Sequence, residues 1–345
     1  MTWARKLLHA SPGNIIITLA VLWALWQAVP PLVEWAFVGA TWFADSPDAC
    51  RRGTGACWAV ITSKHRFLLF GLYPYDEQWR ALLASALMLA LVALTCNRRL
   101  WDRRLVVAWL AVLGLAFLLM RGGAFGLRYV PAEQWGGLPL TLVLSVVAIG
   151  GAFPLAIVLA LGRRSRLPVI RAMSVTYIEI VRGVPLVSVL FMASVMFPLF
   201  LPEGVTIDKV LRAQIGFILF TAAYLAEAVR GGLQSVPKGQ YEAADALGLS
   251  TVQKLRLVIL PQALRASIPP VVNQFIAMFK DTSLVVIIGL YDLLTTTRIA
   301  LTDPPWRPYY VEAYIGAGLI YFVFCFALSR ASLRLERSLN AGVRV

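Results

Sequence analysis

Long apolar runs alternate with short charged segments along this chain. An α-helix rises about 1.5 Å per residue, so about 20 apolar residues are enough to cross a bilayer. The fifth run is interrupted by Glu179 and Arg182. The runs predict about eight membrane-spanning helices: Ile15–Val33, Arg80–Thr95, Leu105–Met120, Leu138–Leu161, Val169–Leu201, Ala213–Val229, Ile268–Leu290 and Val311–Leu328.

Composition agrees with an all-α polytopic membrane protein. Of the 345 residues, 59% are hydrophobic and 14% are charged, whereas about 25% are charged in ordinary globular domains. A net charge of +14 could indicate a nucleic acid partner. However, the basic residues cluster at the ends of the apolar runs, as membrane topology requires. We therefore expect a lipid bilayer around the chain, and no nucleic acid.

The distribution of Lys and Arg also predicts the orientation. More of them fall in the segments that are inside when the N-terminus is inside, which places both termini in the cytoplasm. The long loop 34–79 is then outside the membrane, and it contains Cys50 and Cys57. An oxidising compartment would allow a disulfide between them. Two free thiols are the alternative.

A polar stretch between the sixth and seventh runs cannot cross a membrane. Pro237 suits the first turn of a helix, and Lys238–Leu247 then has a helical pattern. Gly248 suits a left-handed stop. Ser250 and Gln253 have the spacing of a capping box for a second short helix, which we expect to end at Pro261. The stretch predicts a helical hairpin on the cytoplasmic side.

One face of this hairpin carries small residues. Tyr241, Ala244 and Gly248 share that face, and small side chains would let another protein's backbone come close. Glu242 and Asp245 offer charged contacts beside it. The pattern alone fits either an amphipathic hairpin lying on the membrane surface or a docking element for a soluble partner.

The identities of the residues resemble a known motif. Glu242-Ala-Ala, then Gly248, Val258 and Leu260-Pro261, closely resemble the cytoplasmic coupling motif of permease subunits of binding-protein-dependent ABC importers, with valine where isoleucine is usual. Four further stretches resemble the polar amino acid permease family, with Val184 in place of a common threonine: Trp135–Leu138, Arg182–Pro185, Tyr224–Gly232 and Lys280–Leu284.

The resemblance implies a domain organisation. Residues 135–337 would form the five-helix core of a type I ABC importer, with a coupling hairpin at 236–261 and a cytoplasmic tail at 338–345. Residues 1–130 would be an extension with three transmembrane helices, similar to the larger subunits of general L-amino acid importers. The implied ATPase-coupling residues are Tyr241, Glu242, Ala243, Ala244, Asp245, Gly248, Leu260 and Pro261.

The resemblance also implies partners. These are two copies of an ABC ATPase that holds ATP and Mg²⁺, a periplasmic amino-acid-binding protein and a second homologous permease, with a heterodimer favoured. The location would be the bacterial inner membrane. We find no Ser-His-Asp set, metal cluster or paired catalytic carboxylates, so we expect neither a catalytic site nor a cofactor in this chain. The alternatives are a secondary transporter driven by an ion gradient and a non-transporting assembly subunit.

Charges inside the predicted spans are further candidates. Lys280 and Asp281 lie near the middle of the seventh span, where a charge costs at least about 2.5–3.5 kcal/mol and normally faces a bundle interior or a cavity. One hypothesis is a substrate pathway in which Lys280 meets a carboxylate; the other is a structural ion pair with a neighbouring span. Polar neighbours that would extend the pathway are Asn273, Gln274, Thr282 and Ser283.

Two acid–base pairs at helical spacing suggest structural or gating roles. Glu179 and Arg182 stand three residues apart and can pair along one helix face. Pro185 removes a backbone donor nearby and allows a kink. Glu227 and Arg230 repeat the same spacing near the inner end of the sixth span.

Overall fold

The computed structural model describes residues 12–44 and 46–340. The chain divides into two compact units. The smaller unit holds the described residues up to His65 together with Ala300–Gly316, and the larger unit holds Arg66–Ile299 and the described residues from Ala317. The boundary falls inside three helices, α4, α14 and α15, whose bounds are given below.

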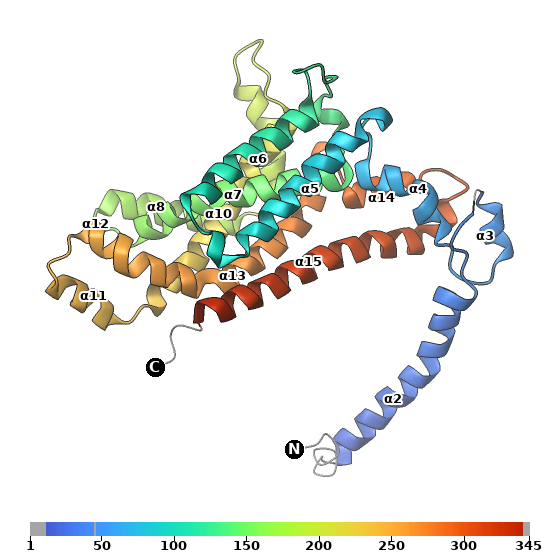
Figure 1. Cartoon of the computed structure of the whole chain (residues 1–345), viewed down its shortest axis with the longest axis horizontal. Helices are drawn as coiled ribbons and strands as arrows, with labels where there is room; N and C mark the ends of the chain where they lie inside the picture. The colour runs from blue at the N-terminus through green and yellow to red at the C-terminus, as the bar shows by residue number, and fades with distance from the viewer. Residues whose placement is uncertain (1–11, 45, 341–345) are drawn as a thin grey trace. The chain divides into compact units, whose positions relative to one another are not determined.

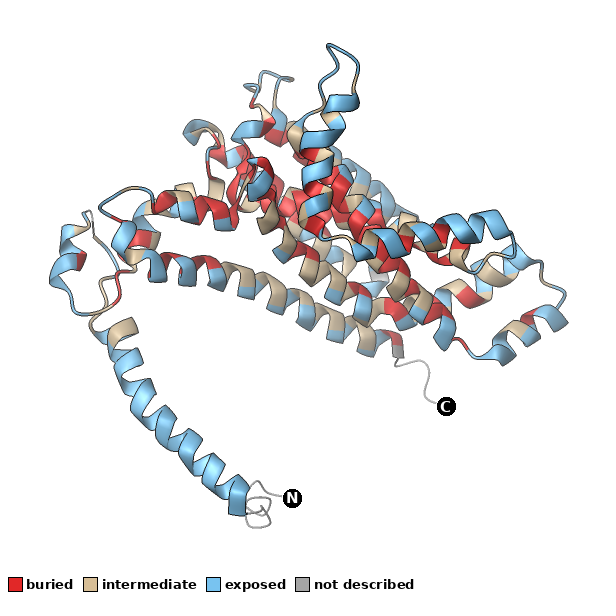
Figure 2. Ribbon diagram, turned by 180° about the vertical axis from the view of Figure 1, so that it is seen from behind, coloured by how far each residue is buried: buried red, intermediate tan, exposed pale blue. Residues whose placement is uncertain are grey.

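The smaller unit contains a long apolar helix and a small disulfide-linked subdomain. Helix α2 has no buried residue, and Figure 2 shows it exposed along its length. Trp23 and Trp26 on it are 67% and 77% exposed, as expected of a helix that contacts lipid. The elements that begin in this unit are α2 (Pro12–Val33), the π-helical η1 (Glu34–Val38), α3 (Asp48–Arg52), α4 (Ala59–Phe70), the 3-10 turn η9 (Arg307–Tyr309) and α15 (Tyr310–Asn340).

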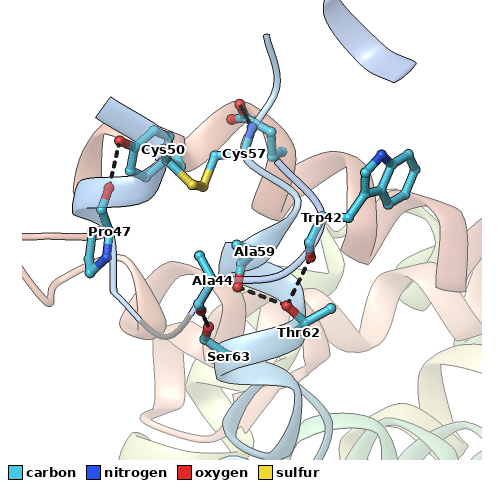
Figure 3. The surroundings of a disulfide bond; sticks show 10 residues. Trp42, Ala44, Pro47, Cys50, Cys57, Ala59, Thr62 and Ser63 are labelled. Carbon is cyan, nitrogen blue, oxygen red and sulfur yellow. Dashed lines mark hydrogen bonds between the residues drawn. A yellow bond between two sulfur atoms is a disulfide. The ribbon is translucent and has the colours of Figure 1, made fainter. Parts of the chain in front are cut away.

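Cys50 and Cys57 form a disulfide, so of the two alternatives the structure contains the bond (Figure 3). The bond lies in a small core with Leu301, Trp306 and Ala313. The backbone N–H of Cys57 donates to Glu312 Oε1 at 2.9 Å inside this core. Long-range contacts therefore hold the loop between α2 and α4 to the start of α15.

The larger unit is a helical bundle with one two-residue strand. Its elements are η2 (Tyr75–Glu77), α5 (Gln78–Thr95), η3 (Arg98–Leu100), α6 (Arg103–Arg121), η4 (Ala132–Gln134), α7 (Gly137–Arg163), α8 (Pro168–Gly183), α9 (Leu186–Phe191), η5 (Met192–Met196), η6 (Phe197–Phe200), α10 (Lys209–Ser235), α11 (Lys238–Ala246), α12 (Thr251–Gln253), η7 (Lys254–Ile259), α13 (Leu260–Asp281), η8 (Thr282–Ile288), β1 (Tyr291–Asp292) and α14 (Leu293–Ala300). Of the η elements, η5 and η7 are π-helical and the others in this unit are 3-10.

The prediction of about eight spans is confirmed. In the described chain, seven helices are long and apolar enough to cross a membrane, or eight if one bent pair counts as a single span. The bent pair is the predicted fifth span, in which α8 and the helix from Leu186 meet at 104°. Val184 is extended, as the residue before a proline favours, and Pro185 has no N–H to continue the helix. The predicted kink therefore divides this span into two helices.

The last predicted span is longer than expected. Helix α15 continues to Asn340, well past the predicted end at Leu328. The predicted tail 338–345 therefore begins inside this helix, and its residues 341–345 lie outside the described residues.

Small residues allow the central helices to pack closely. Helix α7 carries Ala148, Ala152, Ala156 and Ala160 at every fourth position, and all four are fully buried. Ala152, Ala156 and Ala160 of this stripe share a core cluster with Ala222 and Ala226 of α10. Small side chains let membrane helices approach closely and gain van der Waals contact. Helices α7, α10 and α13 form the centre of the larger unit (Figure 1).

The two glycines of the Trp135–Leu138 stretch are needed where α7 begins. Gly137 has a φ of +63°, and a Cβ there would stand 2.0 Å from the carbonyl oxygen of Leu69. Only glycine accepts both the left-handed backbone and the close approach. Gly136 and Gly137 also form bridges to β1, so the motif joins three segments of the larger unit.

Candidate functional site

The polar stretch forms a helical hairpin as predicted. Helix α11 ends at Ala246, and Gly248 follows with a φ of +71°. The N–H of Leu249 donates to Ala244 O at 3.2 Å, and the N–H of Gly248 donates to Asp245 O at 3.0 Å. This pattern is a Schellman motif, which requires a left-handed residue after the helix. The capping box between Ser250 and Gln253 is also present.

The predicted end of the second helix at Pro261 is wrong. The hairpin's second arm, α12, passes through η7 directly into α13, and together they form part of one span from Thr251 to Ile288. Pro261 lies in the first turn of α13. Proline removes a backbone donor, and the helical run accommodates it where the π-helical η7 changes to the α-helix α13. The hairpin is therefore continuous with a membrane helix.

The small face of α11 packs on this chain rather than outward. Ala244 is 2% exposed, and Tyr241 packs against the core cluster of α7, α10 and α13. The predicted role of these two residues in letting a partner's backbone approach is therefore wrong, because the chain's own core occupies that face. The pattern of small residues indicated which face of α11 is covered, but it did not indicate that this chain's own core covers it.

Three helices hold α11 in place. Arg164, at the end of α7, donates from Nη1 to the Tyr241 hydroxyl at 3.1 Å and to Leu233 O at 3.0 Å. Gln262 Nε2 of α13 donates to Gln240 Oε1 at 3.0 Å. A movement of α11 would therefore displace the ends of α7, α10 and α13 through these hydrogen bonds.

The opposite side of the hairpin is free. Glu242, Ala243 and Gly248 are exposed, and so are three large apolar side chains. The exposed fractions are 78% for Leu247, 72% for Val252 and 63% for Leu257. We call the exposed residues Glu242, Ala243, Ala246, Leu247, Gly248, Val252 and Leu257 the hairpin tip. Of the predicted coupling residues outside the tip, Asp245 is exposed and pairs with Lys254 Nζ at 2.5 Å, Leu260 is half-buried and Pro261 is exposed.

A charge cluster lies beside the hairpin. Glu227 Oε1 is 2.9 Å from Arg163 Nη1, and its Oε2 is 2.9 Å from Arg230 Nη2 and 3.6 Å from Arg182 Nη1. Glu179 lies 2.9 Å from the same Arg163 nitrogen. The cluster joins α7, α8 and α10. Charge-assisted bonds between several helices fix their relative positions more firmly than one pair within a helix.

One predicted pairing in this cluster is wrong. Glu179 and Arg182 do not form an ion pair with each other among the described residues; each pairs with another helix instead. The pairing of Glu227 with Arg230 is confirmed. The i, i+3 spacing permits a pair within a helix, but Arg163 and Glu227 lie close enough to compete for both members of the first pair.

The polar residues predicted to line a pathway divide between two environments. Asn273 and Lys280 are exposed on α13, seven residues and thus about two turns apart on one face. Lys280 has no ion pair with any residue that the structure describes, so the alternative of a structural pair with a neighbouring span within this chain finds no support. Gln274, Asp281 and Ser283 are half-buried.

Thr282 does not lie on the exposed face. It is fully buried, and its hydroxyl donates to Phe279 O at 2.8 Å. At this residue α13 gives way to the 3-10 segment η8, so the α-helix is interrupted here. Because the change of helix type rotates the chain, the residues on either side of Thr282 do not form one continuous polar face.

Sequence analysis missed the arginines that connect these parts. Arg163 and Arg164 were assigned only to membrane topology, yet one enters the charge cluster and the other holds Tyr241. Their adjacency at the end of α7 was the available signal. The partners lie about 64 and 77 residues away in sequence, which no local pattern reveals.

Comparison with known proteins adds family relationships to this geometry. Residues 152–341 match the family model described as "Binding-protein-dependent transport system inner membrane component". The inner membrane amino-acid ABC transporter permease protein YhdY of Escherichia coli (strain K12) is 49% identical, and the alignment covers 99% of this chain and 94% of that protein. The glutamate/glutamine/aspartate/asparagine transport system permease protein BztC of Rhodobacter capsulatus is 38% identical, with the same coverage of 99% and 94%.

A solved structure and a shorter relative match part of the chain. The structure described as "Crystal structure of an amino acid ABC transporter with histidines" is 32% identical with a TM-score of 0.53, and it covers 59% of this chain and 92% of that chain. The probable glutamine ABC transporter permease protein GlnP of Bacillus subtilis is 35% identical over 62% of this chain and 96% of its own length. This chain therefore contains nearly the full length of such relatives together with additional residues.

Proposed function

Because this chain belongs to the family of binding-protein-dependent transport system inner membrane components, we propose that it is the permease of an ATP-driven importer of L-amino acids. The family is one of transport permeases and not of enzymes. The amino-acid substrate class is carried over from the names of the relatives. The bilayer is the natural environment of the apolar spans.

The observation that carries this proposal is the hairpin, anchored on one side and free on the other. Its inner face is held by Arg164 and Gln262, and its tip exposes Leu247, Val252 and Leu257. Apolar side chains exposed on a polar element mark a protein interaction site. We propose that a separate ABC ATPase docks on the hairpin tip.

The route of coupling runs through the end of α7. Arg164 contacts α11, and the adjacent Arg163 contacts Glu179 and Glu227. A displacement of α11 would therefore reach α8 and α10 through one rigid helix end. We propose that Glu179, Arg182, Glu227 and Arg230 transmit the movement, with the bend at Pro185 as a hinge between α8 and α9.

The orientation and the partners belong to the same proposal. The bias of Lys and Arg places the hairpin and both termini in the cytoplasm. Two ATPase copies would then hold ATP and Mg²⁺ on that side, so this chain needs no cofactor of its own. A periplasmic amino-acid-binding protein would deliver substrate from the opposite side.

A second permease would complete the pathway, and a heterodimer is favoured. Ala266, Pro270, Asn273 and Lys280 are exposed along α13, and their spacing places them on one helix face. Lipid offers no hydrogen bonds to Asn273 and no counter-charge to Lys280. We propose that this face looks across the pathway toward the second subunit, where Lys280 meets the carboxylate of the transported amino acid.

The two alternatives are not favoured. A secondary transporter driven by an ion gradient would have no use for an exposed tip that is anchored to three helices. A non-transporting assembly subunit would not need a membrane-helix lysine that forms no ion pair with the described residues. The family to which the chain belongs is one of transport components.

Co-purification with the ATPase tests the proposal. Glu242→Arg and Leu247→Asp change two tip side chains that make no contact within the chain's core, so the permease should still fold. We expect both variants to reach the membrane and to lose the ATPase when the complex is purified in detergent. Glu203→Arg makes the same charge change in an exposed loop between η6 and α10, and it should retain the ATPase.

Two results would contradict the proposal. One is ATPase retention by both tip variants at the level of the Glu203→Arg control. The other is amino acid uptake by reconstituted vesicles that contain an ion gradient but no nucleotide.

A further inference from the structure

A cavity of about 500 Å³ lies between the end of α5 and the last turns of α15, both within the larger unit. Arg98, in the connection after α5, and Arg334, on α15, both line it, and of the described residues that line it none is acidic. The lining is Cys96, Asn97, Arg98, Arg334, Leu335 and Ser338. The cavity is thus positively charged without an internal counter-charge.

The arginines keep most of their hydrogen-bonding capacity. Arg98 Nη1 donates to Ser338 O at 3.2 Å, and a guanidinium group has five N–H donors. Arg334 is exposed and has no hydrogen bond or ion pair with any described residue. Arg98 caps the end of α15 through one of its donors. This role does not explain why the other N–H groups of Arg98, and the guanidinium of Arg334, face the cavity without partners among the described residues.

The cavity is lined by residues at the ends of candidate membrane spans, where a bilayer has its headgroup region. The candidate spans on either side of the α5–α6 connection end at Thr95 and begin at Arg103. The indole N–H groups of Trp101 and Trp109 both donate to Thr95, at 2.8 and 3.0 Å, and tryptophan prefers the membrane–water interface. The end of α15 lies on the same side of the larger unit as α11 (Figure 1).

We propose that this cavity binds the phosphate headgroup of an anionic phospholipid such as phosphatidylglycerol. Forked arginines recognise phosphate oxygens through paired charge-assisted bonds. Leu94, Leu100 and Leu333 are 48%, 41% and 42% exposed near the cavity in sequence, and they suit the acyl chains. Basic pockets between membrane helices on the cytoplasmic side are a recognised form of lipid site.

Native mass spectrometry of the full chain tests this site. The protein is delipidated in detergent and titrated with phosphatidylglycerol, and the fraction with one bound lipid is measured. Each arginine near an anionic surface raises the affinity about fivefold, so Arg98→Gln with Arg334→Gln should weaken binding by about 30-fold. Arg98→Lys with Arg334→Lys keeps the charges and should bind more tightly than the glutamine variant, which separates lost recognition from misfolding.

The matched control is Arg103→Gln with Arg104→Gln, which removes the same number of positive charges from the start of α6 without touching the cavity. It should bind phosphatidylglycerol as the unchanged chain does. Equal weakening in the control would show attraction by bulk charge and would overturn the proposal. So would equal binding of phosphatidylcholine, or displacement of the lipid by inorganic phosphate at millimolar concentration, which would identify a site for soluble phosphate.

Discussion

Glu227 shows how a single side chain acquires its role from residues distant in sequence. It is 17% exposed, and three arginines from three helices lie within ion-pair distance of its carboxylate. A carboxylate with so many cationic donors is stabilised in its charged form, and each arginine depends on it in turn. Its removal leaves three positive groups close together.

We predict that Glu227→Gln destabilises the permease by about 2 kcal/mol, because it leaves the partly buried Arg182 and Arg230 without an ion-pair partner among the described residues. The measurement is thermal unfolding of the purified protein in detergent. Glu179→Gln is the control, since Glu179 is 54% exposed and has one partner in the cluster; its cost should stay below about 1 kcal/mol. Equal costs for the two variants would show that Glu227 does not organise the cluster.

The helical hairpin shows the balance of local and tertiary effects within one structural element. Local chemistry sets its turn, through the left-handed Gly248 and the Ser250 capping box. Tertiary contacts set its orientation, through Arg164 and Gln262. The two contributions can be separated by substitution of glycine.

We predict that Gly248→Ala destabilises the C-terminal end of α11 by about 1 kcal/mol, because alanine is strained in the left-handed region. No atom lies within 4 Å of a Cβ placed there, so the cost comes from the backbone alone. Hydrogen–deuterium exchange of the α11 amides should speed up. Gly239→Ala is the control, at an open site inside the same helix. Alanine should stabilise the helix there by up to about 1 kcal/mol, so exchange should be unchanged or slower. Faster exchange in Gly239→Ala, or an unchanged exchange rate in Gly248→Ala, would contradict the role of Gly248 as the left-handed end of α11.

At the scale of the whole molecule, an exposed lysine on a membrane helix needs an environment that this chain alone does not provide. Lys280 has no ion pair among the residues that the structure describes, and a charge facing lipid is costly. A cavity or a counter-charge would have to come from outside the described part of this chain.

We therefore predict that Lys280→Met lowers amino acid uptake by at least about tenfold, equivalent to one lost charge-assisted bond to the substrate. Uptake into vesicles reconstituted with the complete complex is the measurement, and Lys280→Arg should recover part of the rate. Coupled ATP hydrolysis should fall with uptake in the methionine variant. Unchanged uptake and hydrolysis would remove Lys280 from the pathway.

Much of the fold could be predicted from the sequence, and less of the candidate site. The spans and the hairpin turn were found because hydrophobic length, Gly248 and the capping box act over a few residues. The end at Pro261 was mistaken because a proline in a first turn and a proline after a last turn look alike without the next helix. The pairing of Glu179 failed because its partner lies 16 residues away, on another helix.

The sequence by itself determined the membrane class, the number of spans and the position of the helical hairpin, since apolar length and backbone preference are properties of short segments. The tertiary structure decided which face of α11 is covered, which arginines surround Glu227 and where the basic cavity forms. These features depend on helices that meet across long stretches of chain, and the energy of such a contact exists only once the helices have packed.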